Sequence, residues 1–122
     1  EFILNHIAKP NIRGGEFEPW ASQMTALAGL GNVVCKISGA TTEADLDRWT
    51  IDDVRPYVEH ALTVFGEDKV LFGSDWPVVT QAASYTRWAE TVEEITKDFS
   101  EAQKDKLWKQ NAVRFYRLED EV

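Results

Sequence analysis

The sequence predicts an α/β domain in which three parallel strands alternate with helices. Three short apolar runs, Phe2–Ala8, Val33–Ser38 and Lys69–Asp75, have the composition typical of buried strands. The segments that follow each run carry apolar residues at helical spacing. Apolar strands that alternate with helices are typical of a parallel sheet covered by helices, because each crossover places a helix on the sheet.

Two helices are expected between the strands. Pro19 suits the start of the first helix, and Gly29 marks its end. Residues 40–50 are polar and predict a long loop or a short helix. Gly66 marks the end of the second helix. The predicted apolar stripes are Trp20, Met24, Leu27 and Ala28 in the first helix, and Val54, Tyr57, Val58, Ala61, Leu62 and Phe65 in the second.

Two further helices are expected after the third strand. The first covers Tyr85–Phe99, where apolar residues recur at helical spacing. Ser100 and Gln103 have the spacing of a capping box, which predicts the start of a last helix that reaches Phe115. The acidic tail, residues 119–122, is expected to be frayed.

Composition argues against several classes of protein. A chain of 122 residues with 43% apolar residues is one domain or a piece of one. The net charge of -8, without a basic stripe, argues against nucleic-acid and anionic membrane partners. The single cysteine, Cys35, lies in an apolar run and is expected to be a buried residue, not a nucleophile. One cysteine and no visible signal peptide predict a cytoplasmic protein, and the missing initiator Met suggests that the true N-terminus lies elsewhere.

One titratable residue lies near the end of each predicted strand: His6, Lys36 and Asp75. The carboxyl ends of parallel strands meet at one edge of a sheet, where α/β proteins bind their ligands. We therefore expect the three side chains to share one pocket, with Asp75 as a catalytic or metal-binding carboxylate. Because side chains alternate along a strand, the expected inward partners are Leu4 and Ala8 with His6, Val34 and Ser38 with Lys36, and Leu71 and Gly73 with Asp75.

Each of these three residues also has a structural interpretation. Asp75 is a residue type that often opens a turn, and His6 could be a hydrogen-bonded structural histidine. Lys36 could form an ion pair with an acidic neighbour such as Asp75, because lysine is seldom buried without a partner.

The tryptophans divide into two groups. Trp76 follows Asp75 directly and is predicted to form a wall of the pocket. Trp49 is a weaker candidate, on a loop that could fold over the pocket mouth. His60, beside a helical stripe, is given no role. The tryptophans on helical stripes, which are expected in the core, are Trp20, Trp88 and Trp108.

Four segments of the chain resemble the lactone-hydrolysing branch of the amidohydrolase superfamily. This branch includes sugar lactonases of the L-fuconolactonase and L-rhamnonolactonase type, and relatives that open pyrone dicarboxylate lactones. The resemblance extends over essentially all 122 residues. Its segments are His6-x-x-Lys9-Pro10, Val34–Gly39, Phe72–Pro77 and Asn111–Tyr116.

The resemblance implies that residues 1–122 are a partial (β/α)8 TIM-barrel domain, namely the last three βα units and the C-terminal helix. A whole barrel needs about 250 residues, so about half would be absent. The intact enzyme would open a sugar-acid lactone, a small-molecule substrate, with Asp75 and His6 as catalytic residues and Lys36 and Trp76 as substrate-binding residues. His6 and Asp75 would also be ligands of one divalent ion such as zinc, if a metal is used; many lactonases of this branch need none. The family's His-x-His pair has no match in this chain.

Two alternatives remain open at this stage. The chain could be a non-catalytic half-barrel or interaction module that is completed by self-association through its exposed edges. It could also belong to a metal-dependent amide hydrolase or decarboxylase of the same superfamily. In either case we expect the 122-residue chain alone to be inactive and to expose apolar residues that a whole barrel would cover.

Overall fold

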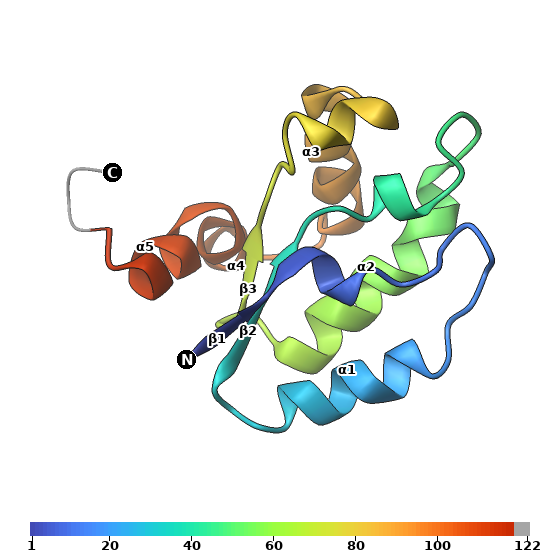
Figure 1. Cartoon of the computed structure of the whole chain (residues 1–122). Coiled ribbons are helices and arrows are strands. Elements are labelled where there is room, and N and C mark those ends of the chain that lie inside the picture. The colour runs from blue at the N-terminus through green and yellow to red at the C-terminus, as the bar shows by residue number, and fades with distance from the viewer. Residues whose placement is uncertain (119–122) are drawn as a thin grey trace.

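The computed structural model describes residues 1–118 and contains one three-stranded parallel sheet (Figure 1). The strands are β1 (Phe2–Leu4), β2 (Val33–Ile37) and β3 (Val70–Phe72), in the spatial order β1-β2-β3. Both pairings are parallel, so all three strands end at the same edge of the sheet. The predicted α/β class and parallel strands are confirmed.

Helices follow each strand, as predicted. Helices α1 and α2 lie side by side against one face of the sheet, and the last helical segments run along β3 (Figure 1). None of the helices within residues 1–118 is long and apolar enough to cross a membrane. The bounds are α1 (Trp20–Ala28), α2 (Ile51–Phe65), α3 (Tyr85–Ile95), α4 (Glu101–Asp105) and α5 (Asn111–Tyr116), with shorter turns η1 (Asn5–Ala8), η2 (Thr41–Glu43), η3 (Val78–Gln81) and the π-helical η4 (Lys106–Gln110).

The helix boundaries follow the capping signals in the sequence. Ser100 and Gln103 form the predicted capping box at the start of α4. Thr50 and Asp53 form another at the start of α2. Gly66 ends α2 with a φ of 80°, a conformation in which a β-carbon would be strained.

The core lies between the sheet and the helices. Cys35 and Ile37 of β2 are fully buried against Val54 and Val58 of α2 and the rest of one apolar cluster. Burial raises the pKa of the Cys35 thiol to about 12, so the thiol stays protonated at neutral pH. Cys35 is therefore a small buried core residue, as predicted.

The first strand is shorter than predicted, because the chain turns after Leu4. His6, Ile7 and Ala8 have φ values of 54°, 44° and 62°, in the left-handed region, and belong to the turn η1. Side-chain alternation ends where a strand ends. The expectation that Leu4 and Ala8 share the face of His6 was therefore wrong: Leu4 lies opposite Cys35 and packs on the helix-side core, and Ala8 is exposed.

The third strand is also shorter than the predicted Lys69–Asp75 run. Pairing with β2 continues one residue past Phe72, because the Gly73 amide donates to the Ile37 carbonyl. Asp75 lies beyond the strand, with a φ of 56°. The strand end and the carboxylate are thus separated by a short turn.

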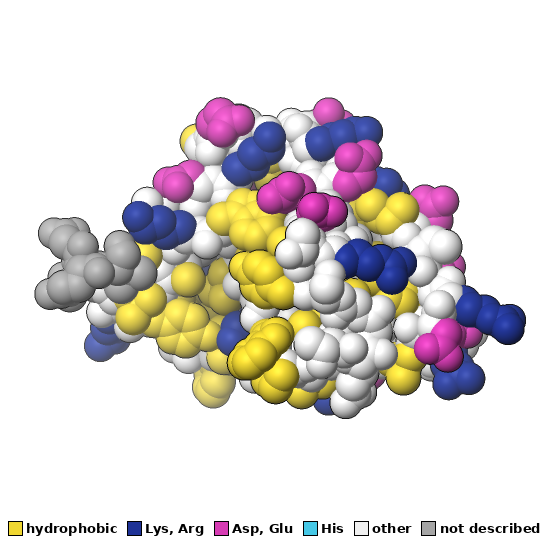
Figure 2. Space-filling model, turned by 90° about the horizontal axis from the view of Figure 1, so that it is seen from above, with side chains coloured by type: hydrophobic (Ala, Val, Ile, Leu, Met, Phe, Trp, Pro, Cys, Tyr) yellow, Lys and Arg dark blue, Asp and Glu magenta, His cyan; other side chains and the backbone are white. Residues whose placement is uncertain are grey.

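The apolar surface agrees only in part with the expectation for a partial barrel. Phe2 on β1 is 68% exposed, and Figure 2 shows apolar side chains gathered across one face of the molecule. Val34 and Leu71 point away from the helix-side core, yet they are only 3% and 2% exposed. In the strand register Val34 lies beside Ile3 and Leu71 beside Lys36. The expectation of exposed apolar residues therefore holds for Phe2 on the outer strand and was wrong for Val34 and Leu71 on the inner face.

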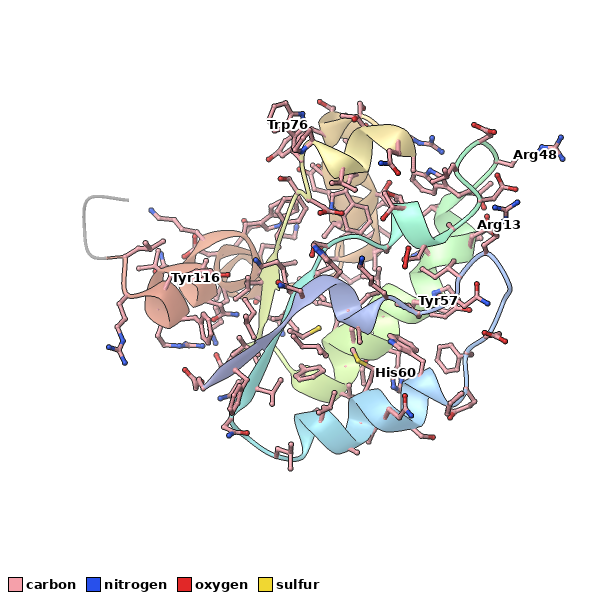
Figure 3. All side chains as sticks on the ribbon, viewed as in Figure 1. Arg13, Arg48, Tyr57, His60, Trp76 and Tyr116 are labelled. Atoms are coloured by element: carbon pink, nitrogen blue, oxygen red, sulfur yellow. The ribbon has the colours of Figure 1, made fainter. Side chains whose placement is uncertain are left out.

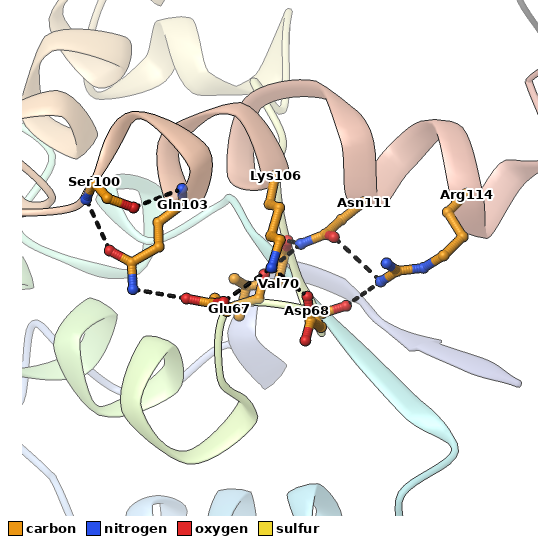
Figure 4. A network of polar contacts seen from close by, with 8 residues as sticks. All are labelled: Glu67, Asp68, Val70, Ser100, Gln103, Lys106, Asn111 and Arg114. Atoms are coloured by element: carbon orange, nitrogen blue, oxygen red, sulfur yellow. Dashed lines mark hydrogen bonds and ion pairs between the residues drawn. The ribbon is translucent and has the colours of Figure 1, made fainter.

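Asn111 covers part of the β3 edge that β2 leaves free. The Lys69 carbonyl accepts from the Cys35 amide, so the next carbonyl, that of Val70, points away from β2. The side-chain amide of Asn111, which is 2% exposed, donates to the carbonyls of Val70 and Glu67 at 2.7 Å each (Figure 4). This satisfies an edge carbonyl that would otherwise be buried without a donor.

An acidic and basic cluster beside this edge joins the C-terminal helix to β3. Lys106 Nζ lies 2.9 Å from carboxylate oxygens of both Glu67 and Asp68 (Figure 4). Hydrogen bonds from Lys106 hold the pKa of Glu67 and of Asp68 below their ordinary values of 4.5 and 3.8. Those same contacts raise the pKa of Lys106.

We expect the Lys106→Gln variant to lose less of its free energy of unfolding on acidification than the unchanged chain. A carboxylate whose pKa is lowered by folding stabilises the folded state above its ordinary pKa and loses that effect as the pH falls through the folded value. The measurement is urea unfolding from pH 7 to about pH 3, with Lys109→Gln on the same helix as control. Equal slopes against pH in both variants would contradict the assignment.

Candidate active site

His6 and Asp75 meet beyond the carboxyl ends of the strands. Nε2 of His6 lies 3.6 Å from Oδ1 of Asp75, and the two side chains are 26% and 14% exposed. The structure therefore brings together two of the three predicted titratable groups, although His6 reaches the site from a turn and not from a strand. A partly buried carboxylate beside an imidazole is an arrangement that can move a proton.

The turn η1 is held by contacts that leave the His6 ring directed at the site. Ile7 is fully buried in the core, and the indole nitrogen of Trp20 donates to the Ile7 carbonyl at 2.7 Å. The left-handed backbone of His6 and Ile7 costs roughly 1–2 kcal/mol per residue. Burial of Ile7 and the hydrogen bond from Trp20 offset that cost, so the core holds the histidine in place.

Asp75 forms a turn through its main chain, which leaves its carboxylate available. The Asp75 carbonyl accepts from the Val79 amide at 2.8 Å and so begins η3. The structural interpretation of Asp75 as a turn residue is thus correct for its backbone. Within the described residues the carboxylate faces His6. Asp75 therefore forms the turn with its main chain and contributes to the predicted site with its side chain.

Trp88 anchors the end of β3 next to this turn. Its ring is 1% exposed, and its indole nitrogen donates to the Gly73 carbonyl at 2.9 Å. The ring also stacks on Phe72, with centroids 6.4 Å apart. The predicted core role of Trp88 is confirmed, and this core residue also supports the strand end that carries Asp75.

Lys36 lies on the inner face of the sheet, as predicted, but leans away from Asp75. A β-carbon on Gly73 would lie 2.8 Å from Cδ of Lys36, so the missing side chain makes room for the lysine stem. Nζ of Lys36 lies 5.7 Å from the ring centroid of Tyr116. Among residues 1–118 the structure shows no Lys36–Asp75 ion pair, so the alternative interpretation of Lys36 as the partner of Asp75 is not seen there. Contact of Lys36 with a substrate remains a prediction.

The two tryptophans considered for the pocket differ in position. Trp76 is 66% exposed and lies at the outer end of the segment after β3 (Figure 3). Its role as a pocket wall remains a prediction. Trp49, the weaker candidate, is instead a core residue: it is 3% exposed, and its indole nitrogen donates to the Ala82 carbonyl at 2.9 Å. The guanidinium of Arg87 covers this ring at 3.8 Å, so tertiary contacts draw the loop into the core.

His60 lies away from the site, between α1 and α2 (Figure 3). Its Nε2 donates to the Ala21 carbonyl at 2.8 Å, and its ring packs against Phe17 and Trp20. The sequence-based assignment of no catalytic role to His60 agrees with this structural position.

Ser38 and Gly39 contact His6, although neither was predicted to be a functional residue. Oγ of Ser38 lies 2.7 Å from Nδ1 of His6, and Ser38 is fully buried. Gly39 has a φ of 69°, and a β-carbon there would lie 2.8 Å from Cβ of His6. The available signal was the alternation that placed Ser38 on the inner face with Lys36.

The described residues supply only part of a metal site. An imidazole nitrogen and a carboxylate oxygen 3.6 Å apart are donors that zinc accepts. Within residues 1–118, however, no group of three or more His, Cys, Asp or Glu side chains could hold a metal ion. A catalytic zinc site uses three protein ligands, so these residues alone do not complete one.

Comparison with known proteins shows that this chain matches one described protein family and several relatives. Residues 1–118 match the protein family described as Amidohydrolase. An L-fucono-1,5-lactonase from Burkholderia multivorans is 37% identical over 128 residues, which cover 95% of this chain and 43% of the relative. The chain therefore spans less than half the length of this relative.

Solved structures match the same part of a barrel. An amidohydrolase from Burkholderia multivorans with bound zinc has a TM-score of 0.87 and 36% identity, covering 94% of this chain and 43% of that chain. A putative 2-pyrone-4,6-dicarboxylic acid hydrolase from Pseudomonas putida has a TM-score of 0.74 at 21% identity, covering 96% of this chain and 43% of that chain, which shows a shared fold. The predicted partial match to a TIM barrel is confirmed.

Proposed function

This chain belongs to the amidohydrolase family, and on that premise we propose that it is the C-terminal part of a longer hydrolase that opens a sugar-acid lactone. The observation that carries the proposal is the pair of His6 and Asp75, 3.6 Å apart beyond the strand ends. Active sites of (β/α)8 barrels are built at that end of the strands. The lactonase relatives supply the substrate class.

In the proposed reaction Asp75 is the general base. Its carboxylate takes a proton from a water molecule as the water oxygen attacks the lactone carbonyl carbon. The ring C–O bond then breaks, the leaving oxygen receives the proton that Asp75 took from water, and the product is an open hydroxy acid. A carboxylate that is 14% exposed and supported by one imidazole remains accessible to water and substrate.

The other predicted residues have roles in binding and stabilisation. We propose that His6 donates a hydrogen bond to the negative charge that develops on the carbonyl oxygen. Lys36 would meet negative charge on the substrate, and Trp76 would form an apolar wall for the sugar ring. Their side chains lie partly or largely exposed around the strand ends, which suits contact with a small molecule.

We propose that His6 and Asp75 would provide two ligands if the longer protein binds a divalent ion. Such an ion polarises a carbonyl oxygen and lowers the pKa of bound water. The remaining ligands would have to come from segments other than residues 1–118, which contain no complete site. The steps assigned to Asp75 and His6 do not depend on this ion.

We expect the longer protein to open at least one sugar-acid lactone and the 122-residue chain to open none. The chain supplies only part of the barrel and only two of the expected site groups. A pH-indicator assay of proton release measures the activity of both proteins on a panel of sugar-acid lactones that includes L-fucono-1,5-lactone. Release of carbon dioxide or cleavage of amides, lost on metal removal, would instead favour a decarboxylase or an amide hydrolase.

A second candidate is a non-catalytic module completed by self-association. It is favoured by Phe2, 68% exposed on β1, a strand that pairs on one side only within the described residues. Gel filtration with light scattering distinguishes the candidates. A stable oligomer without lactone-opening activity would favour this module over the enzyme.

A further inference from the structure

Ser38, the buried residue directly after β2, contacts one nitrogen of the His6 ring. Oγ of Ser38 and Nδ1 of His6 are 2.7 Å apart, while Nε2 on the other side of the ring points to Asp75. From this geometry we infer that Ser38 is a positioning residue that holds the His6 ring by donating a hydrogen bond to Nδ1, which leaves the ring proton on Nε2. The inference deepens the proposed function and rests on it for the role of His6 in catalysis.

Within residues 1–118 the Ser38 hydroxyl makes one hydrogen bond, to the His6 ring. Ser38 is fully buried, so its hydroxyl cannot turn to bulk water. Gly39, the next residue, lets the ring lie directly on the backbone, because a β-carbon there would be 2.8 to 3.0 Å from three ring-side atoms of His6. A ring confined by backbone on one side and by a hydrogen bond at Nδ1 has little freedom to rotate.

The position of Asp75 determines the direction of the hydrogen bond from Ser38. An ionised carboxylate can only accept hydrogen bonds. If Nε2 carried a lone pair, that lone pair would face the carboxylate oxygen 3.6 Å away, which is unfavourable. The neutral ring is therefore protonated at Nε2, and Nδ1 accepts a hydrogen bond from the Ser38 hydroxyl.

This tautomer separates the roles of the two catalytic groups. With a hydrogen on Nε2, neutral His6 is a hydrogen-bond donor toward the reacting centre and cannot take a proton at that atom. The base must then be Asp75. Ser38 acts through His6 alone, since its buried hydroxyl contacts Nδ1 on the side of the ring away from Asp75.

Nitrogen-15 NMR of histidine-labelled chain tests the tautomer directly. The sequence contains two histidines, and His60 serves as the internal control because its Nε2 donates to the Ala21 carbonyl far from Ser38. At about pH 8, where a free imidazole is neutral, we expect His6 protonated at Nε2 in the unchanged chain. The Ser38→Ala variant should show a shifted Nδ1 signal at His6, because that nitrogen loses its hydrogen-bond donor, and unchanged His60 signals.

Activity in the longer protein provides the second readout. Ser38→Ala should lower kcat/KM for the lactone by about 10–100-fold, the usual effect of losing a group that orients a catalytic histidine. Ser38→Cys has a weaker S–H donor, so its kcat/KM should fall between those of the parent and of Ser38→Ala. Ser22→Ala changes an exposed serine on α1 and should keep the parent kcat/KM.

The outcomes separate failure of this inference from failure of the proposed function. A His6 ring protonated at Nδ1, or identical His6 spectra with and without Ser38, would overturn the inference whatever the enzyme does. If Ser38→Ala does not fold, as judged by loss of the His60 signals, the unchanged chain and Ser38→Cys still decide the tautomer. A longer protein that opens no lactone, with the Nε2 proton observed, would remove the lactonase proposal and leave the tautomer assignment intact.

Discussion

Replacing Asp75 with asparagine should lower kcat for lactone opening by about 10²–10⁴-fold in the longer protein, the range typical of a lost general base. Asparagine has nearly the same size and keeps a carbonyl oxygen beside His6, but it cannot take a proton from water. Because the loss affects the chemical step, KM should change much less than kcat. Initial rates against substrate concentration, with proton release as the signal, measure both.

Two controls keep this result interpretable. Asp105→Asn removes an exposed carboxylate at the end of α4, away from the strand ends, and should keep the parent kcat. Urea unfolding of Asp75→Asn should show a folded protein, since its carboxylate faces one histidine and not the core. A folded Asp75→Asn enzyme that retains the parent rate would end the assignment of Asp75 as the base.

Replacing Trp88 with alanine should lower the free energy of unfolding by about 3–5 kcal/mol, the usual cost of emptying a buried aromatic site. Trp88 is 1% exposed, packs against Phe72, and donates to the Gly73 carbonyl at 2.9 Å. The variant therefore loses ring packing and leaves a carbonyl at the end of β3 without its donor. Urea unfolding followed by circular dichroism measures the change.

Two matched variants separate the contributions of Trp88. Trp88→Phe retains most of the ring but lacks the indole N–H. It should lower the free energy of unfolding by about 1–3 kcal/mol, because one buried carbonyl is left without a donor. Trp76→Ala removes a tryptophan that is 66% exposed and should stay within about 0.5 kcal/mol of the parent. If Trp88→Ala destabilised the protein no more than Trp76→Ala, the described packing at the end of β3 would be incorrect.

The helices and their ends could be predicted because the relevant signals are local. The apolar stripe of α2 recurs every three to four residues, and Gly66 marks the end of the helix. Ser100 and Gln103 signal the start of α4 in the same way. These features act between residues close in the chain, so they can be read without knowing what the helix packs against.

The candidate site could be predicted only in outline. Alternation correctly placed Lys36, Leu71 and Gly73 on one face, and the strand order brought His6 and Asp75 to one edge. Alternation failed for Leu4 and Ala8, since the chain leaves the strand before His6. It also gave no warning that Trp49 would be buried, because that depends on contacts with Ala82 and Arg87, more than thirty residues away.

The sequence by itself determined the α/β class, the order of strands and helices, the caps, and which titratable residues lie near the strand ends. Tertiary structure alone decided the left-handed turn at His6, the contact of its ring with Ser38, and the direction in which Lys36 leans. The physical reason is that periodicity and capping act over a few residues. A strained backbone or a buried hydrogen bond is stable only when distant segments pack around it.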